Sequence, residues 1–334
     1  MLRLRPLTLH RPTSLAEAIA LKSEYGTDAT YFAGGTDLLP NLKLLQVDAQ
    51  VLIALADVAE LRGIEAVDDD GGSTLHLGAA TRLSTLAADP VVRSLVPSLA
   101  DAAGRVASPQ VRNMATLGGN LCLDTRCRYI NQSQLFRDAL GGCLKSHGKE
   151  CHVVPGGQGC VAALSTDTAP LLIALGAELD LLGPDGPRSV PLGRFYSTDG
   201  LAHTDLRPGE IVVRVRVPVP AASTHVRNRK WAVRKSIDFP LVAVAVRLDL
   251  DPAAPVLTGG RIVVGVLGPR PRQLPLDRFA GASIDEALAL QLGDLAFDRS
   301  RPLPNVPYDA DYRRERLRVE VRRAVRDIAA SLEG

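Results

Sequence analysis

The chain has 334 residues, enough for two hydrophobic cores, and its 39 basic and 37 acidic residues leave a formal net charge of +2. This balance does not favour nucleic acid or an anionic membrane as a partner, and aromatic residues, at 4%, are too scarce for base-stacking platforms. The longest apolar stretches, among them 51–56 and 171–175, are too short to span a bilayer. The N-terminus lacks the apolar core of a secretory signal, so we expect a cytoplasmic, reducing environment.

The first half of the chain predicts short helices and strands in alternation. Ser14 and Glu17 have the spacing of a capping box, and Gly26 stands where the helix that they begin would end. Further on, apolar runs separated by turn residues predict more short elements. We expect strands at 29–33, 51–54 and 73–79, and helices at 83–88 and 92–107.

The second half predicts a separate unit. Residues 208–210 (Pro-Gly-Glu) mark a turn before an alternating strand at 211–217. The stretch 217–224, rich in proline and alanine, is the best candidate for a domain boundary. The chain therefore divides into a domain at 1–218 and another at 225–334. In the second domain we expect strands at 239–250 and 261–267 and a charged helix at 312–332.

Two glycine pairs, Gly34–Gly35 and Gly118–Gly119, each follow an apolar segment. Neither matches Gly-x-Gly-x-x-Gly or the nucleotide P-loop. Because glycine has no Cβ, such a turn exposes backbone N–H groups to which an anion can come close. Either pair alone is more simply an ordinary tight turn. Together they predict a divided cradle for a diphosphate, flanked by Thr36, Asp37, Thr116 and Asn120.

All five cysteines lie between Cys122 and Cys160. Successive cysteines are separated by four, fifteen, seven and eight residues, so the segment contains no Cys-x-x-Cys knuckle of a structural zinc site. An odd count fits a disulfide framework badly, whereas iron–sulfur clusters tolerate wide spacings. The pattern favours an iron–sulfur cluster over zinc or free thiols, and all three stay open on spacing alone.

Three segments resemble the FAD-binding segments of the flavin subunit of the xanthine dehydrogenase family. They are Phe-Ala-Gly-Gly-Thr-Asp-Leu at 32–38, Ala-Thr-Leu-Gly-Gly-Asn-Leu at 115–121 and Ser-Thr-Asp-Thr-Ala-Pro at 165–170. The resemblance extends from about residue 5 to residue 328 and includes 208–211, 230–240, 261–265 and 312–314.

An insertion departs from the usual pattern of that family. In most of its flavin subunits the Gly-Gly-Asn segment runs almost directly into the Ser-x-Asp segment, whereas here roughly forty residues with all the cysteines separate them. The insertion is similar to one in the β subunit of 4-hydroxybenzoyl-CoA reductase, where it holds a [4Fe–4S] cluster. The segments that carry this second resemblance are 120–127, 131–133, 142–145 and 151–154.

The family resemblance implies an α+β fold with two parts. A two-part FAD-binding domain of the vanillyl-alcohol-oxidase/PCMH type would carry the iron–sulfur loop at about 122–162, and a C-terminal α+β domain of the CO dehydrogenase flavoprotein type would follow. The FAD diphosphate would lie against the main chain of both glycine turns. The implied cofactor-binding residues are Ala33, Gly34, Gly35, Thr36, Asp37, Leu38, Val106, Thr116, Gly118, Gly119, Asn120, Asp167, Ile211 and Lys230.

Some of these residues also have a plain structural interpretation. Asp167 would hydrogen-bond a hydroxyl of FAD, whereas Asp37 could equally cap the helix after it. Val106 and Ile211 would line the adenine end, but apolar residues are more often simply core. Lys230 would lie close to the flavin, or else be a solvated strand residue.

In the insertion, the ligand positions of the reductase match Cys127, Cys143, Cys151 and Cys160. Cys122 matches none of them, and its place after Gly-Gly-Asn predicts a buried, inert thiol near the flavin. Four cysteines complete a ligand set, so His147 and His152 are not expected to bind metal. Basic side chains close to the ligands, namely Arg126, Arg128 and Lys145, would raise the reduction potential of the cluster if they lie near it.

The sequence shows no group of catalytic acid–base or nucleophilic residues, and the family resemblance implies none on this subunit. There the substrate reacts at a molybdenum cofactor on a large partner, and a small partner carries two [2Fe–2S] clusters. The resemblance implies an oxidoreductase subunit that relays electrons between a ferredoxin-like donor or acceptor, its own [4Fe–4S] cluster and FAD, and these partners. In 4-hydroxybenzoyl-CoA reductase electrons flow inward and the aryl hydroxyl of a CoA ester is removed reductively.

Two alternatives stay open. The chain could be the flavin subunit of a molybdenum hydroxylase that oxidises another substrate, with electrons flowing outward. It could instead be a binding module stabilised by zinc.

Overall fold

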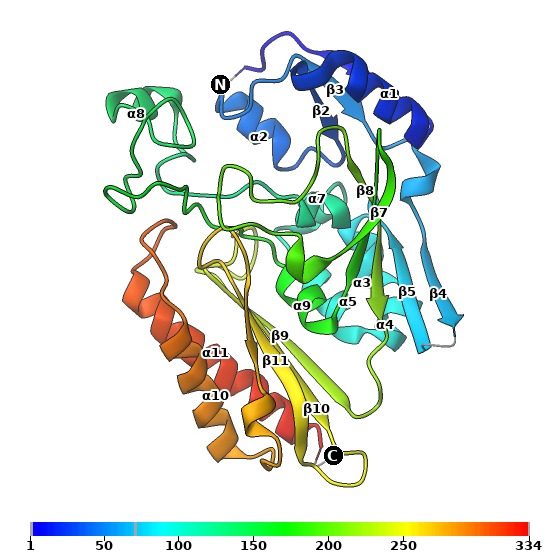
Figure 1. Ribbon diagram of the computed structural model, residues 1–334, viewed down its shortest axis with the longest axis vertical. Coiled ribbons are helices and arrows are strands. Elements are labelled where there is room, and N and C mark those ends of the chain that lie inside the picture. The colour runs from blue at the N-terminus through cyan, green and yellow to red at the C-terminus, as the bar shows by residue number, and fades with distance from the viewer. Residues whose placement is uncertain (1–2, 70–71, 333–334) are drawn as a thin grey trace.

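The computed structural model describes residues 3–69 and 72–332, and its strands form three sheets (Figure 1). The first sheet is parallel, in the order β1-β3-β2, with β1 at Thr8–His10, β2 at Ala29–Phe32 and β3 at Val51–Ala54. Helices α1 (Leu15–Tyr25) and α2 (Leu38–Lys43) belong to the same lobe. Leu15 and Ala18 of α1 share one core with Val51 and Ile53 of β3.

The first predicted helix is confirmed. Ser14 Oγ accepts the N–H of Glu17 at 3.2 Å, and Gly26 ends the helix with φ 53°. The Glu17 carboxylate accepts the N–H of Thr13 at 2.8 Å, one residue earlier than a standard capping box requires.

The second sheet is antiparallel, in the order β4-β5-β8-β6-β7, and its apolar face belongs to the largest core (Figure 1). Its strands are β4 (Ile64–Asp69), β5 (Gly72–Gly78), β6 (Glu178–Gly183), β7 (Gly186–Pro191) and β8 (Ile211–Pro218). The helices of this lobe are α3 (Leu83–Ala88), α4 (Pro90–Leu95), α5 (Pro97–Gly104), α6 (Pro109–Arg112), α7 (Leu117–Leu121) and α9 (Ala169–Leu175).

The single helix expected at 92–107 is wrong. Val96 leaves the helical region with φ −139° and ψ 65°, and Pro97 begins a new helix as its first residue. Proline has no N–H to continue a helix and its ring disfavours helical geometry in the residue before it. The segment is therefore the two helices α4 and α5.

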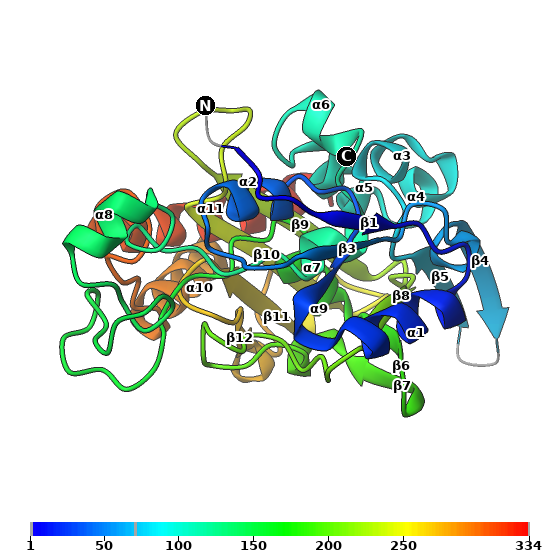
Figure 2. The ribbon, with the colours of Figure 1, turned by 90° about the horizontal axis from the view of Figure 1, so that it is seen from above.

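The third sheet is antiparallel, in the order β12-β11-β10-β9, and α10 and α11 cover one of its faces (Figures 1 and 2). Its elements are β9 (Thr224–Trp231), β10 (Val242–Leu250), β11 (Leu257–Gly265), β12 (Arg272–Pro275), α10 (Glu286–Arg299) and α11 (Ala310–Ala330). Alternate residues of β10 turn to the opposite face, where Ala245 joins the core of the second sheet. The predicted strands at 239–250 and 261–267 and the last helix are confirmed with shifted ends.

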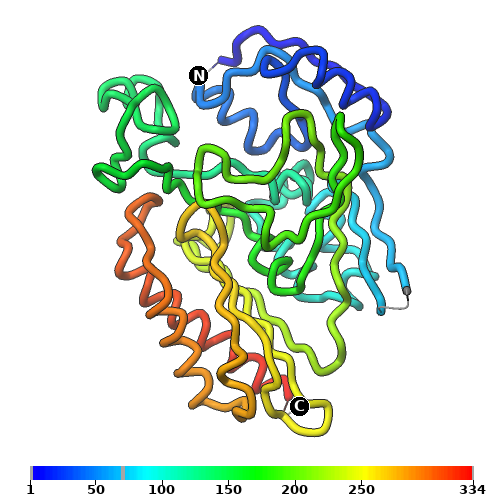
Figure 3. Tube along the Cα trace, viewed as in Figure 1, coloured from blue at the N-terminus to red at the C-terminus, as the bar shows by residue number. Residues whose placement is uncertain are grey.

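The cysteine segment leaves the body of the molecule after α7 and returns before α9, as the trace in Figure 3 shows. Its only helix is α8 (Gln134–Ala139). Arg137 of α8 is buried, and its guanidinium donates to the carbonyl oxygens of Leu44 and Leu45 beyond α2 at 2.8 and 3.1 Å. This anchor ties the protruding loop to the first lobe. Within residues 3–69 and 72–332, no helix is both long and apolar enough to cross a membrane.

Candidate cofactor sites

A cavity of about 650 Å³ lies where the first lobe, the second lobe and the segment 237–239 meet. Its volume is in the range of small-molecule and cofactor sites. With the single exception of Lys230, every cofactor-binding residue expected from the sequence lines it: Ala33, Gly34, Gly35, Thr36, Asp37, Leu38, Val106, Thr116, Gly118, Gly119, Asn120, Asp167 and Ile211. We call this space the large cavity.

The first glycine turn depends on the small size and backbone freedom of glycine. A Cβ on Gly34 would collide with the carbonyl oxygen of Met114, so only glycine lets this turn lie against the segment before the second turn. Gly35 has φ +70°, which favours glycine. In the described part of the chain, the backbone N–H groups of residues 34–37 donate to no acceptor. They are therefore free to bind a phosphate oxygen.

The second glycine turn is built differently, since it forms the start of helix α7. Thr116 is the N-cap, and its Oγ1 accepts the N–H of Gly119 at 3.1 Å. The N–H groups of Leu117 and Gly118 donate to Thr81 and Ala79, and that of Asn120 donates to Thr116. Because these four N–H groups already have acceptors, residues 118–120 line the large cavity without offering a free backbone N–H.

Asn120 and Asp167 connect the second turn to the third predicted segment. The Asn120 Oδ1 accepts hydrogen bonds from the hydroxyls of Thr166 and Thr168, both at 2.7 Å. Asp167, between these threonines, is 6% exposed, and its Oδ1 lies 2.7 Å from Lys230 Nζ. Burial raises the pKa of Asp167 to about 6, although the Lys230 ammonium acts in the other direction.

Lys230 does not line the large cavity but supports its wall from β9. Its side chain is 11% exposed, so it is not a solvated strand residue. Besides pairing with Asp167, its ammonium donates to the carbonyl oxygen of Arg105 at 3.1 Å. Val106, which follows Arg105, is buried, and so is Ile211. Each belongs to a hydrophobic core and also lines the large cavity.

Asp37 faces an arginine that comes from the cysteine segment. Arg126 Nη1 lies 3.3 Å from Asp37 Oδ1, and the guanidinium carbon stands 4.0 Å from the centre of the Phe239 ring. Burial raises the pKa of Asp37, with Arg126 acting to lower it. Asp37 occupies the N-cap position of α2 but makes no side-chain capping hydrogen bond there. Its carboxylate is instead oriented by Arg126 and by the Asn41 amide at 3.0 Å.

A second, small cavity is lined by all four cysteines expected as cluster ligands: Cys127, Cys143, Cys151 and Cys160. Cys151 and Cys160 are buried, and the other two are partly exposed. All four thiols are free, and burial raises the pKa of Cys127 to about 11. We call this space the cysteine cavity. Tyr129, Lys145 and His152 also line it.

Short hydrogen-bonded turns hold these cysteines. The Cys127 N–H donates to Asn131 Oδ1 and the Cys143 N–H to Ser146 Oγ, both at 2.9 Å. The carbonyl of Cys160 accepts the N–H of Gly200 at 2.8 Å. Local turns therefore fix the backbone at Cys127 and Cys143, and Gly200, from outside the loop, fixes it at Cys160. Among the residues described, no three His, Cys, Asp or Glu side chains converge closely enough to hold a single metal ion.

Comparison with known proteins identifies the family. The family described as the FAD-binding domain in molybdopterin dehydrogenase matches residues 5–220. The chain belongs to this family. It is 30% identical over 318 residues to the carbon monoxide dehydrogenase medium chain of Hydrogenophaga pseudoflava, and the match covers 95% of this chain and 94% of that one. The aldehyde oxidoreductase FAD-binding subunit of Escherichia coli is 34% identical over 266 residues, 77% of this chain and 82% of that subunit.

Solved structures agree with this assignment. Carbon monoxide dehydrogenase from Hydrogenophaga pseudoflava superposes with a TM-score of 0.77 at 28% identity, covering 97% of both chains. Quinoline 2-oxidoreductase from Pseudomonas putida 86 gives 0.76 at 27% identity, covering 98% of this chain and 99% of that one. The predicted fold class is confirmed. The protein is an FAD-binding subunit of the molybdenum hydroxylase family and hence an oxidoreductase subunit.

Several residues of this FAD-binding subunit's large cavity escaped sequence analysis. Tyr31, Asp124, Leu206 and Phe239 line it, and Arg126 orients Asp37 beside it. Arg126 carried a signal, because its place next to Cys127 made it a candidate neighbour of the cluster, and Asp124 and Phe239 lie in segments that carry the resemblances. Cys122 also lines the large cavity and not the cysteine cavity, and burial raises the pKa of its thiol to about 12.

Proposed function

We propose that this chain is the electron-relay subunit of a molybdenum-containing oxidoreductase, with FAD in the large cavity and a [4Fe–4S] cluster on Cys127, Cys143, Cys151 and Cys160. The observation that carries the proposal is that these four cysteines line one cavity, and that the segment from Cys122 to Cys127 leads from the large cavity directly to it. The chain would divide at 218–225 into an FAD-binding domain and a C-terminal domain, consistent with the end of β8 at Pro218 and the start of β9 at Thr224.

The residues of the large cavity fit FAD. The free N–H groups of residues 34–37 would hold the diphosphate, with the Gly118–Gly119 main chain as the opposite wall. Asp167, kept in place by Lys230, would accept a hydrogen bond from a hydroxyl, and Val106 and Ile211 would cover the adenine end. Bound FAD supplies redox chemistry in steps of one or two electrons.

The donor set of the cysteine cavity fits a four-iron cluster, because it holds four cysteines. A single zinc ion would need all four sulfurs about 2.3 Å from one point. A [4Fe–4S] cluster takes one thiolate at each iron, so its ligands stand further apart. The space between the four cysteines is about 20 Å³, roughly the room of one water, so assembly of the cluster has to spread the loop.

The partners of the proposal follow from the family. A large subunit would carry the molybdenum cofactor and the substrate, and a small subunit would carry two [2Fe–2S] clusters. A ferredoxin-like one-electron carrier would exchange electrons at the cysteine loop, which protrudes from the body of the molecule (Figure 1). The arrangement in the cysteine segment resembles 4-hydroxybenzoyl-CoA reductase, so we propose inward electron flow and reductive dehydroxylation of an aromatic CoA ester. We place the protein in a reducing compartment, the cytoplasm, where cysteines stay available as cluster ligands.

A second candidate has support in the comparisons. The relatives named above are carbon monoxide dehydrogenase, aldehyde oxidoreductase and quinoline 2-oxidoreductase, and this favours a hydroxylase in which electrons leave through the flavin subunit. The cysteine loop would then dock an electron acceptor.

The decisive test is anaerobic purification of the chain with its partners, followed by analysis of iron, sulfide, zinc and flavin. We expect about four irons per complex beyond the two small clusters, together with one FAD. Stepwise reduction followed by low-temperature EPR then gives the potential of the cluster, which separates inward from outward flow. Zinc in place of the extra iron, or an absence of flavin, overturns the proposal.

A further inference from the structure

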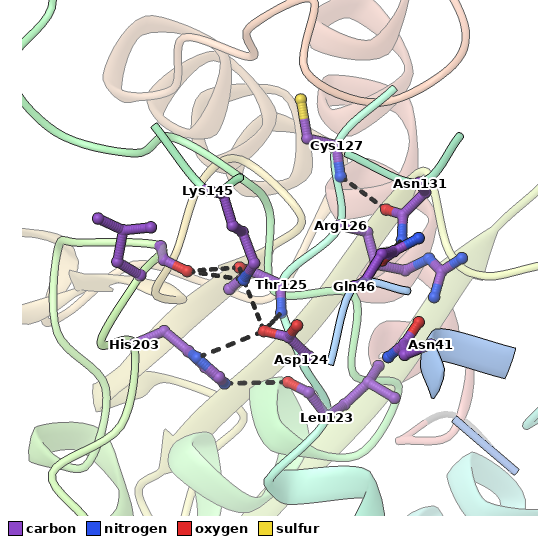
Figure 4. Close-up of polar contacts among 12 residues, drawn as sticks. Asn41, Gln46, Leu123, Asp124, Thr125, Arg126, Cys127, Asn131, Lys145 and His203 are labelled. Carbon is purple, nitrogen blue, oxygen red and sulfur yellow. Dashed lines mark hydrogen bonds and ion pairs between the residues drawn. The ribbon is translucent and has the colours of Figure 1, made fainter. Parts of the chain in front are cut away.

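A lysine and an aspartate join the two cavities. Lys145 lies between two cysteines of the loop and lines the cysteine cavity, whereas Asp124 lines the large cavity. Lys145 Nζ is 2.6 Å from Asp124 Oδ1, with the two side chains 12% and 34% exposed. Figure 4 shows the lysine pointing from the loop toward the aspartate. The two charges of this pair therefore belong to different sites.

Lys145 uses its whole donor capacity in this contact. Besides Asp124, its ammonium donates to Thr125 Oγ1 at 2.5 Å and to the carbonyl oxygen of Gly200 at 2.8 Å. An ammonium group has three donors, so none is left for water. Gly200 itself binds the carbonyl of Cys160, and a Cβ on it would lie 2.9 Å from the Cys160 sulfur. The lysine thus ties together the three chain segments around the cysteine cavity.

The aspartate is fixed as firmly on its own side. Its Oδ1 accepts the N–H of Thr125 at 2.8 Å and lies 4.0 Å from His203 Nδ1 (Figure 4). His203 in turn bonds the carbonyl of Leu123 at 3.0 Å, and burial lowers its pKa. Among the lysine and arginine side chains of the described residues, Lys145 alone forms an ion pair with Asp124.

We propose that the charges of Lys145 and Asp124 shift the reduction potentials of the cluster and of the flavin in opposite directions. This inference rests on the proposed FAD and [4Fe–4S] cluster. A positive charge beside a centre stabilises its reduced form and raises its potential, and a negative charge lowers it. Lys145 raises the potential of the cluster, Asp124 lowers that of the flavin, and each charge partly cancels the effect of the other.

The test is a redox titration of the complete complex and three variants, with the cluster followed by EPR and the flavin by absorbance. In Lys145→Met both potentials fall and that of the cluster falls more, because the cation is lost and Asp124 stays uncompensated. In Asp124→Asn both rise, and that of the flavin rises more. The larger shift is about tenfold in the reduction equilibrium, which is 59 mV for one electron. The double variant Lys145→Met/Asp124→Asn returns both potentials close to those of the wild type.

Lys149→Met is the matched control, because Lys149 lies exposed in the same loop. It leaves both potentials unchanged. If the pair only holds the loop together, both single variants loosen it and shift the potentials in the same direction, and the double variant does not recover. That result overturns the inference while the cluster stays in place. A wild-type complex without the extra iron overturns the proposed function, and the inference with it.

Discussion

The two cavities are adjacent but differ in how the chain builds them. The wall of the large cavity comes from segments that lie as far apart as Tyr31 and Phe239, and many of its residues belong to hydrophobic cores. The cysteine cavity is lined only by residues from Cys127 to Ala162, in a loop whose one helix is α8. The large cavity is therefore fixed by the fold itself, whereas the shape of the cysteine cavity depends on local turns.

This difference predicts different responses to loss of a ligand. A site whose walls are core residues persists without its cofactor, because burial of apolar surface maintains it. A loop held by a few hydrogen bonds and one arginine anchor gains much of its order from the metal that it binds. Changes in the cysteine loop should therefore have strong but local effects, and changes in the large cavity should also affect the body of the molecule.

The largest effect is expected from Cys143→Ser. A serine at this position is a poor iron ligand, so the variant should lose essentially all of the extra iron and keep most of its FAD. Iron, sulfide and flavin analysis of the purified complex measures both. Limited proteolysis should cleave the loop faster than in the wild type.

Cys122→Ser is the control for that variant, because Cys122 lines the large cavity and not the cysteine cavity. It should keep the iron. A full cluster signal in Cys143→Ser would reject the ligand assignment, and loss of FAD together with the iron would reject the independence of the two sites.

The reverse separation is expected from Gly119→Val. A Cβ on Gly119 would lie 2.9 Å from Thr116 Oγ1, the N-cap atom of α7, so this cap must shift to admit the side chain beside the large cavity. We expect FAD occupancy to fall at least about tenfold, the effect of about 1.4 kcal/mol, while the iron content stays unchanged. Gly104→Val, at the end of α5, is the matched control and should keep FAD, because a Cβ there would meet only the Ala87 Cβ at 3.8 Å, an ordinary contact. Equal FAD content in both variants would contradict the role of the second turn.

The sequence predicted those parts of the two sites that local motifs or residue type determine. The glycine turns and Asp167 were predicted because they lie in recognisable sequence motifs, and the cysteines were predicted because of their residue type. The sequence left open whether Arg126 and Lys145 lie near the cluster ligands; Arg126 turns to Asp37 and Phe239, whereas Lys145 lines the cysteine cavity. A side chain's direction depends on tertiary contacts that adjacency in the chain does not encode.

The misses in the fold have similar causes. Strand β9 escaped because Thr224–Trp231 is mostly polar, and it is a strand because its partner β10 is buried. The helix expected at 92–107 has the right apolar pattern, but Pro97 outweighs it. The different use of N–H groups at the two glycine turns could not be predicted either, since it depends on where Ala79 and Thr81 lie.

A pH-dependent effect is expected in the large cavity alone. The pKa of Asp167 is about 6 in the folded chain, against 3.8 as the ordinary value, because burial disfavours its charge. The folded state therefore binds this proton more tightly, and its stabilising contribution is full below about pH 4 and lost as the pH rises through 6. Relative to Asp167→Asn, the wild type should lose about 3 kcal/mol of unfolding free energy across that window.

Urea unfolding of the wild type and Asp167→Asn at several values between pH 4 and pH 7 measures this difference. The difference between the two curves should be flat above about pH 7. A constant difference over the whole range would mean that Asp167 is ionised normally and that the Lys230 pair outweighs its burial.

The smallest effects come from removing one helix cap in each region. Thr116 caps α7 in the wall of the large cavity, and Ser133 caps α8 in the cysteine loop, where its Oγ accepts the Phe136 N–H at 3.3 Å. Either alanine substitution removes one such hydrogen bond, a loss of about 1 kcal/mol for the helix. Because α7 is part of the main core, Thr116→Ala should lower the global free energy of unfolding by about this amount.

Ser133→Ala should leave global unfolding unchanged and instead raise the rate of amide hydrogen exchange in α8 about fivefold, since 1 kcal/mol changes a local opening equilibrium by that factor. Urea unfolding and hydrogen exchange on the same two variants give both numbers. Equal effects on global unfolding would mean that the cysteine loop unfolds with the body of the molecule. The loop would then be as much a product of the fold as the large cavity, and metal would not be needed to order it.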